Sequence, residues 1–191
     1  MRDELRSWII EPTHDFKGLP KSDDSTHITC IHTRRGDFMA AGFQASDTHF
    51  IREAWKYIAR KNDVKKPISK VVIFGDDVTF MSNLFVGAAL SNDEKAQISN
   101  ATFYISQNSL SDDIIYSKSN CDVVLISASH STFGWWIGYV SAGNTVFYMD
   151  MTAIPMGAWG DGDVNTQDYF LPHWTSLKLA NDNSTIIIGN K

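Results

Sequence analysis

The sequence has no long hydrophobic run and no recognisable leader. No apolar stretch approaches the roughly 18 residues that a membrane-spanning helix requires. The first residues, Met1–Leu5, carry charged side chains of both signs, whereas a signal peptide opens with a basic and then an apolar region. We therefore expect the chain to be soluble as it stands, with any membrane contact made through a segment outside it.

An excess of positive charge is also lacking, because the 191 residues carry a net charge of -5 at pH 7. A nucleic-acid-binding domain usually presents a broad basic field, so we expect no nucleic-acid partner. Low-complexity tracts and internal repeats are absent too, and a hydrophobic fraction of 43% is typical of globular proteins. The chain is therefore expected to fold, and any anion site in it must be a local cluster.

Several signatures of metal and phosphate sites are missing. No His/Cys cluster has zinc spacing, and neither a P-loop nor a Rossmann glycine fingerprint is present. Asp161-Gly162-Asp163 has the D-x-D spacing of some divalent-metal sites, but it lies in a late loop rather than after an early strand. We therefore expect no metal and no cofactor.

Cysteine is scarce, with two residues in the whole chain. Cys30 lies inside an expected strand and Cys121 just before another, so they are either buried thiols or a disulfide. Both readings stay open, and the redox compartment is not settled by them. Asn100-Ala101-Thr102 and Asn183-Ser184-Thr185 are N-glycosylation acceptors if the chain is luminal.

What the sequence does contain is a regular alternation of short apolar runs and helical patterns. Strands are expected at 28–32, 71–74, 102–105, 123–126 and 145–148, and helices at 47–61, 78–86, 112–118 and 131–141. This order predicts an α/β fold with a doubly wound parallel sheet and right-handed crossovers. We divide the chain into an N-terminal segment (1–27), an α/β domain (28–180) and a C-terminal tail (181–191).

The first candidate site is the turn that follows the strand at 28–32, where His32 is followed by Arg34, Arg35, Gly36 and Asp37. Ligands of open α/β sheets bind at the carboxyl ends of strands, and the planar fork of arginine matches phosphate oxygens. An ordinary surface ion pair is the alternative. We expect the arginines to bind a phosphorylated ligand and Asp37 to hold one guanidinium in place.

The second candidate site is a run of hydroxyl residues from Ser127 to Thr132, which ends a strand and opens a helix. Free backbone N–H groups and hydroxyls at a helix start bind phosphate without a charged side chain. An ordinary helix cap is the alternative. Trp135 and Trp136 follow, and we interpret them as core residues rather than as platforms for a sugar.

Two pairs of acidic residues, Asp76-Asp77 and Asp112-Asp113, sit where helices are expected to begin. Most such acids cap helices. A carboxylate can also accept two hydrogen bonds from a guanine base, so Asp113 is kept as a candidate ligand-binding residue.

Taken together, these motifs resemble glycosyltransferase family 11, the α-1,2-fucosyltransferases. His32–Asp37 matches the H-x-R-R-G-D motif of the family. Ser131–Trp136, followed by Gly143–Tyr148, is similar to its second signature, and Tyr169–Trp174 resembles its closing segment. The three motifs occur in order and span 28–179.

The resemblance implies a Rossmann-like nucleotide-sugar-binding domain of GT-B type. It implies inverting transfer of L-fucose, without a metal, from GDP-L-fucose to a hydroxyl, usually O2 of a galactose in a glycan acceptor. The expected location is the luminal side of the Golgi membrane. The residues implied for donor binding are His32, Arg34, Arg35, Asp113, Ser131, Thr132 and Phe133, with Arg35 and Asp37 as the catalytic pair.

The sequence departs from the family pattern in two ways. Only 31 residues precede His32, whereas family members carry an anchor, a stem and an acceptor-side region there, so we expect the donor-binding half of an enzyme. Related fucosyltransferases can carry a glutamate shortly after the arginine motif, but Phe38–Phe43 contains no acid that could act as a base. The alternatives are a truncated or divergent non-catalytic module that binds GDP or GDP-fucose, and a relative of the protein O-fucosyltransferases.

Overall fold

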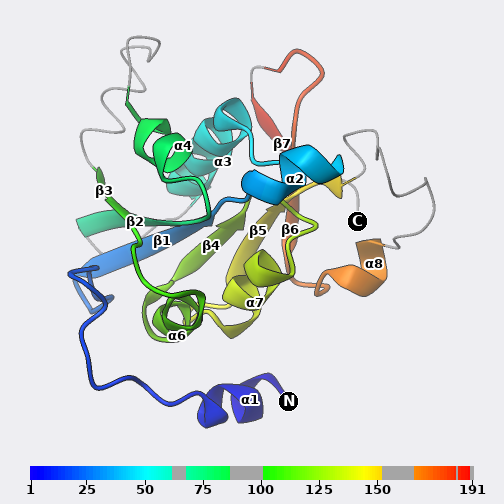
Figure 1. Cartoon of the computed structure of the whole chain (residues 1–191). Helices are drawn as coiled ribbons and strands as arrows, with labels where there is room; N and C mark the ends of the chain where they lie inside the picture. The colour runs from blue at the N-terminus through cyan, green and yellow to red at the C-terminus, as the bar shows by residue number, and fades with distance from the viewer. Residues whose placement is uncertain (62–67, 87–100, 152–165, 184, 190–191) are drawn as a thin grey trace.

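A seven-stranded sheet forms the centre of the computed structural model, which describes residues 1–61, 68–86, 101–151, 166–183 and 185–189 (Figure 1). The strands lie in the order β3-β2-β1-β4-β5-β6-β7, and every neighbouring pair is parallel except β6 with β7. Their bounds are β1 Thr26–His32, β2 Ile68–Phe74, β3 Ala101–Ile105, β4 Val123–Ile126, β5 Thr145–Met149, β6 Thr175–Leu179 and β7 Ile186–Ile188.

Helices cover both faces of this sheet. They are α1 Arg2–Trp8, α2 Gly36–Ala41, α3 Thr48–Lys61, α4 Val78–Asn83, α6 Leu110–Asn120, α7 Thr132–Val140 and α8 Thr166–Tyr169. One core joins α6 and α7 to one face of the sheet, and a second core joins α3 and α4 to the other. The arrangement confirms the predicted α/β, Rossmann-like fold, because a parallel sheet needs apolar cover on both sides.

The predicted elements agree with the structure where the apolar pattern is strongest. All residues of β1 and β4 are buried, and β4 matches its predicted bounds. The predicted helix at 78–86 ends earlier, at Asn83, and the loop expected after the arginine turn contains α2. The sheet also continues past residue 180, where the sequence analysis placed a tail, because β7 pairs with β6.

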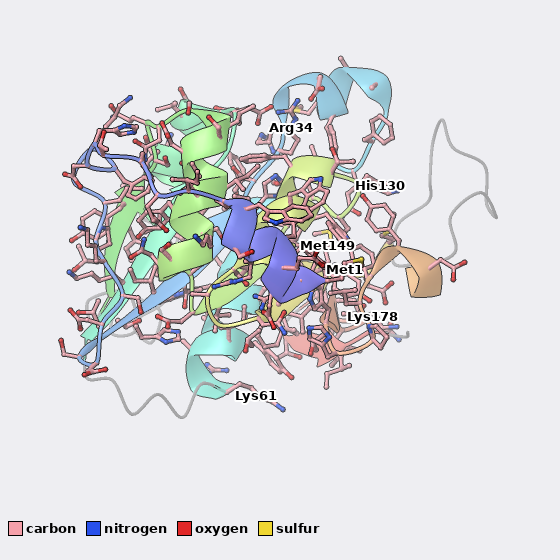
Figure 2. All side chains as sticks on the ribbon, turned by 90° about the horizontal axis from the view of Figure 1, so that it is seen from below. Met1, Arg34, Lys61, His130, Met149 and Lys178 are labelled. Atoms are coloured by element: carbon pink, nitrogen blue, oxygen red, sulfur yellow. A yellow bond between two sulfur atoms is a disulfide. The ribbon has the colours of Figure 1, made fainter. Side chains whose placement is uncertain are left out.

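The N-terminal segment is tied to the domain by arginine side chains. Arg2 Nε donates a 2.7 Å hydrogen bond to the carbonyl of Tyr139, and Arg6 Nη1 donates to the carbonyls of Val140 and Ser141. These carbonyls lie at the C-terminal end of α7, where a cation is favoured by the helix dipole. Figure 2 shows α1 lying against α7 as a result.

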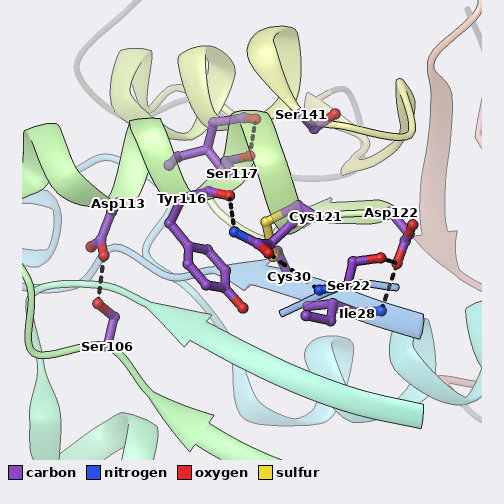
Figure 3. Close-up of a disulfide and its surroundings, with 12 residues drawn as sticks. Ser22, Ile28, Cys30, Ser106, Asp113, Tyr116, Ser117, Cys121, Asp122 and Ser141 are labelled. Atoms are coloured by element: carbon purple, nitrogen blue, oxygen red, sulfur yellow. Dashed lines mark hydrogen bonds between the residues drawn. A yellow bond between two sulfur atoms is a disulfide. The ribbon is translucent and has the colours of Figure 1, made fainter. Parts of the chain in front are cut away.

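Cys30 and Cys121 form a disulfide, so the buried-thiol reading was wrong (Figure 3). The two Cα atoms lie 5.6 Å apart although 91 positions separate the residues in sequence. Cys121 ends α6 just before β4, and the neighbouring Asp122 accepts a 2.8 Å hydrogen bond from the backbone N–H of Ile28. The middle of β1 is thereby fixed to the start of β4.

Among the described residues, no helix has both the length and the apolar character needed to cross a membrane.

Candidate functional site

The two motif turns meet at the point where the strand order of the sheet reverses. From β1 the chain builds outward through β2 to β3, and it then returns to place β4 on the other side of β1. The turns after β1 and β4 therefore leave the carboxyl edge of the sheet side by side. Ligands of doubly wound folds bind in the crevice at such a switch point. We call residues 33–37 the arginine turn and residues 127–131 the serine turn.

Serine hydroxyls connect the two turns. Ser46 Oγ accepts a 2.8 Å hydrogen bond from the backbone N–H of Arg34 and lies 2.7 Å from Ser127 Oγ. Ser127 Oγ in turn donates to the carbonyl of His32 at 2.7 Å. The neighbouring Asp47 caps α3 by accepting from the N–H of Phe50, so Ser46 is not needed as the helix cap. Ser46 is instead a buried support for the arginine turn.

Arg34 is held in the arginine turn by two carboxylates. Asp37 accepts two parallel hydrogen bonds, from Nε and Nη2 of Arg34, each 2.9 Å long. Asp76 Oδ2 lies 3.5 Å from the same Nε atom. The hydrogen bonds to Asp37 raise the pKa of Arg34 and those to Arg34 lower the pKa of Asp37, so both remain charged. The structure thus shows the guanidinium contact that was expected of Asp37.

Arg35 is held by different groups. Its Nη1 donates to the carbonyl of Ser46 at 2.7 Å, its guanidinium carbon lies 4.4 Å from the centre of the Phe80 ring, and its Nε lies 3.6 Å from Asp77 Oδ2. Asp77 also caps α4 by accepting from the N–H of Phe80. The helix-cap reading of this acid was therefore right, and its ion pair with Arg35 is an addition.

Each arginine keeps one terminal nitrogen available. Among the described residues, neither Nη1 of Arg34 nor Nη2 of Arg35 has a hydrogen-bond partner. The side chains are 30% and 25% exposed, and Nε of Arg35 is buried without a hydrogen-bond partner. Three carboxylates balance their charge, which means that an anion would be bound here by oriented donors more than by a net positive field.

His32 lies beneath the serine turn and is completely buried. Its Nε2 lies 3.1 Å from Ser131 Oγ, and its ring packs 5.8 Å from that of Phe133. Burial, with a smaller contribution from Arg34, lowers the pKa of His32 to about 3, so the imidazole is neutral near pH 7. His32 therefore supports Ser131 from below and has no exposed atom with which to contact a ligand.

The start of α7 presents one exposed hydroxyl. Ser131 caps the helix by accepting from the N–H of Gly134 at 3.2 Å, and its side chain is buried. Thr132 is exposed and Phe133 is half-buried. The structure therefore leaves the Thr132 side chain exposed at the start of α7, directly after the serine turn.

Asp113 is not brought to the two turns. It lies on α6, is 4% exposed, and accepts a 2.5 Å hydrogen bond from Ser106 after β3, which is separated from β1 by β2. Burial raises its pKa to about 6. Its helix is capped by Ser109, which accepts from the N–H of Asp112, so neither acid of this pair is the cap.

No group of three or more His, Cys, Asp or Glu side chains within the described residues could hold a metal ion. Asp161-Gly162-Asp163 lies outside the described residues.

With this geometry established, the chain was compared with known proteins. The family model for glycosyl transferase family 11 matches residues 1–178. A Caenorhabditis elegans protein named "Putative galactoside 2-alpha-L-fucosyltransferase svh-11" is 45% identical over 190 residues, which are 98% of this chain and 51% of that protein. A second, named "Galactoside 2-alpha-L-fucosyltransferase", is 28% identical over 198 residues, covering 93% of this chain and 49% of its own length.

The chain spans about half the length of the curated relatives it matches. No solved structure matches it.

Proposed function

Because the chain belongs to glycosyltransferase family 11, we propose that it forms the donor-binding half of a fucosyltransferase. The enzyme transfers L-fucose from GDP-L-fucose to a galactose hydroxyl of a glycan. The transfer proceeds with inversion and gives an α-1,2 linkage. The observation that carries this proposal is the arginine turn, where two fixed guanidinium groups each offer an unused nitrogen at the switch point of the sheet. A nucleoside diphosphate is the ligand that suits such donors.

The proposed reaction places negative charge where these donors are. The acceptor hydroxyl attacks C1 of fucose from the face opposite the phosphate, the bond from C1 to the phosphate oxygen breaks, and GDP leaves with the bonding electrons. The hydroxyl proton passes to a base. Negative charge grows on the departing phosphate, and donors that are already oriented stabilise it most in the transition state.

Each residue of the site has a separate part in this proposal. Arg34 and Arg35 bind the diphosphate, and Thr132 contacts it from the start of α7 together with the N–H groups there. Asp37 is a positioning residue that fixes Arg34. His32 acts only through Ser131. We leave Asp113 out, because it is buried and bonded to Ser106 two strands away.

We further propose that the reaction needs no metal, since the two guanidinium groups supply oriented hydrogen-bond donors to the phosphates where a cation would otherwise bind them. Calorimetry of GDP binding in EDTA and in manganese tests this. Equal affinities are expected, whereas binding that requires manganese would promote Asp161-Gly162-Asp163 to a metal site.

The test of the donor site is calorimetry of GDP and GDP-fucose binding to the wild-type chain and to Arg35→Ala and Arg35→Lys. A charged hydrogen bond contributes roughly 1.5–3 kcal/mol, so we expect affinity to fall about ten- to a hundredfold in Arg35→Ala. Lysine cannot reproduce the planar fork and should not restore it. Arg60→Lys, at an exposed position at the end of α3, is the matched control. Wild-type affinity in Arg35→Lys would remove the arginine turn from the proposal.

A non-catalytic module that binds GDP is the competing function. Radiolabelled fucose transfer from GDP-fucose to a β-galactoside separates the two when it is measured on this chain joined to an acceptor-side region, because the competing function still predicts donor binding without transfer there.

For the location we propose the lumen of the secretory pathway, and within it the Golgi. The disulfide supports this, since such bonds persist in oxidising compartments. Asn183, in the exposed turn between β6 and β7, begins an acceptor triplet. In secreted expression a glycosidase that removes N-glycans should shift the mobility of the wild type. The shift should be smaller in Asn183→Gln, which loses the part due to this triplet, and unchanged in Thr185→Ser.

A further inference from the structure

Beside the serine turn is a pocket that the donor proposal does not use. It has a volume of about 270 Å³ and lies between α7 and α8, lined by Thr132, Trp135, Trp136, Asp168 and Tyr169. Thr132 belongs both to this pocket and to the exposed start of α7, so the pocket adjoins the proposed donor site. We infer that it is a subsite for one neutral sugar ring of the acceptor, a β-galactoside, an inference that rests on the proposed function.

Trp136 provides a wall that is exposed and yet held in place. Its side chain is 41% exposed. The ring meets Trp135 edge to face at 5.1 Å and 84°, and Tyr139 at 5.7 Å and 90°. Two perpendicular contacts fix the orientation of the indole, so little conformational freedom remains to be lost when a ligand stacks on it.

Trp135 anchors the opposite side of the pocket to the core. It stacks on Tyr139 at 4.8 Å and 15°, and its Nε1 donates a 2.8 Å hydrogen bond to the carbonyl of Tyr169 on α8. It also contacts Trp174, which is fully buried. The two helices that line the pocket are therefore joined by a direct bond, and the expectation that Trp135 and Trp136 serve only the core is incomplete, because both also line a cavity.

The aromatic lining suits the stacking of a sugar ring. A pyranose has faces of C–H groups and a rim of hydroxyls, and the negative face of an aromatic ring attracts polarised C–H groups. The axial O4 of galactose leaves one unbroken patch of C–H groups on the opposite face, which favours stacking on Trp136. The exposed lining of the pocket is almost entirely apolar, so the contact is made with the C–H face of the sugar and its hydroxyl rim faces solvent.

The size and charge of the pocket narrow the class of ligand further. Sites for drug-sized ligands occupy about 300–1,000 Å³, so a volume of about 270 Å³ fits a single ring. Asp168 is the charged residue among those that line it, which disfavours an anionic sugar or a second phosphate. The donor and acceptor chemistries are thus separated, with the charged ligand at the arginine turn and the neutral one beside α7.

The test uses saturation-transfer NMR on the whole chain with methyl β-galactoside, and compares it with methyl β-glucoside and sialic acid. We expect a signal strongest on the C–H groups of one galactoside face, weaker for the glucoside, and absent for sialic acid. In Trp136→Ala the galactoside affinity should fall on the order of tenfold, as for a stacked aromatic anchor. Trp136→Phe should retain part of it. Trp8→Ala, at an exposed tryptophan on α1, is the matched control.

GDP calorimetry on the same variants separates this inference from the proposed function. GDP binding should be unchanged in Trp136→Ala. If the wild type does not bind the galactoside, or if Trp136→Ala binds it as well as the wild type does, the subsite is overturned and the donor site is unaffected. A Trp136-dependent self-association seen by sedimentation would overturn it in favour of a contact between copies of the chain. Absence of GDP binding in the wild type overturns the proposed function instead.

Discussion

The arginine turn and the serine turn meet at one edge of the sheet, yet they are built in opposite ways. The two arginine side chains of the arginine turn are 25–30% exposed and are held by carboxylates. The serine turn consists of hydroxyls that are buried and held by a neutral histidine and by backbone groups. One turn keeps its donors oriented by opposite charge at the surface, and the other keeps its shape by burial.

The comparison shows two ways of preparing a site for an anion before the ligand arrives. Ion pairs at the surface cost little desolvation but hold the side chains weakly. Buried hydroxyl networks hold their members firmly, since any unpaired polar atom there is expensive. Changes at the arginine turn should therefore act mainly on binding, and changes at the serine turn mainly on stability.

The largest expected effect comes from removing the disulfide between β1 and the residue that precedes β4. The double variant Cys30→Ala/Cys121→Ala should lose about 2–5 kcal/mol of unfolding free energy, because the disulfide closes a long loop in the unfolded chain. Urea unfolding measures the change. Wild-type protein unfolded in a reducing agent is the control and should match the variant. Unchanged stability would mean that the sheet alone holds the two turns together.

The second effect compares one glycine in each turn region. An added Cβ at Gly134 would lie 2.6 Å from Nδ1 of the fully buried His32, and one at Gly36 would lie 2.8 Å from Oδ2 of Asp76. The His32 ring has nowhere to move, so Gly134→Ala should cost about 1–3 kcal/mol.

The Asp76 side chain is 23% exposed and can turn away, so Gly36→Ala should cost less stability and more GDP affinity. Thermal unfolding and calorimetry on both variants check this pattern. Equal losses of stability would contradict the division between the turns.

A third effect is the dependence of stability on pH. The pKa of His32 falls from 6.5 to about 3 on folding, so the unfolded chain binds more protons between these values. Stability should therefore decrease as the pH falls below 6.5, by about 1.4 kcal/mol per pH unit at most. His32→Asn should remove this slope, as measured by urea unfolding between pH 7 and pH 4.

Asp113 changes the stability with pH in the opposite direction to His32, so its contribution has to be measured separately. Its pKa rises from 3.8 to about 6 on folding, so its contribution to stability is complete below pH 3.8 and is lost as the pH rises through 6. Asp113→Asn should therefore steepen the decline of stability in acid. A slope unchanged by His32→Asn would show that the imidazole is not held neutral in the fold.

The smallest effect concerns Asp37 alone. Asp37→Asn breaks the paired hydrogen bonds that orient Arg34, while the carboxylate itself is largely exposed. Exposed ion pairs contribute little to stability, so the melting temperature should stay unchanged and GDP affinity should fall by about two- to fivefold. Scanning calorimetry measures the melting temperature and titration calorimetry measures the GDP affinity, each at low and at high salt. A large loss of stability would mean that the arginine turn depends on this pair for its fold.

The elements with a strong local pattern could be predicted from the sequence. β4 is four consecutive buried apolar residues, and α3 repeats its apolar positions at helical spacing. β6 and β7 were not predicted, because Thr175–Leu179 mixes polar and apolar residues and Ile186–Ile188 is too short to be distinctive. Ser46 gave no local signal of its role, since its partners Arg34 and Ser127 are distant in sequence.

By itself the sequence determined the alternation of strands and helices, and the placement of arginines after one strand and hydroxyls after another. These properties depend on neighbouring residues and on the general geometry of parallel sheets. Only the tertiary structure decided that Cys30 pairs with Cys121, that His32 is buried and neutral, and that Trp136 lines a pocket with Asp168. Each of these depends on groups far apart in the chain, whose separation is set by how the layers pack.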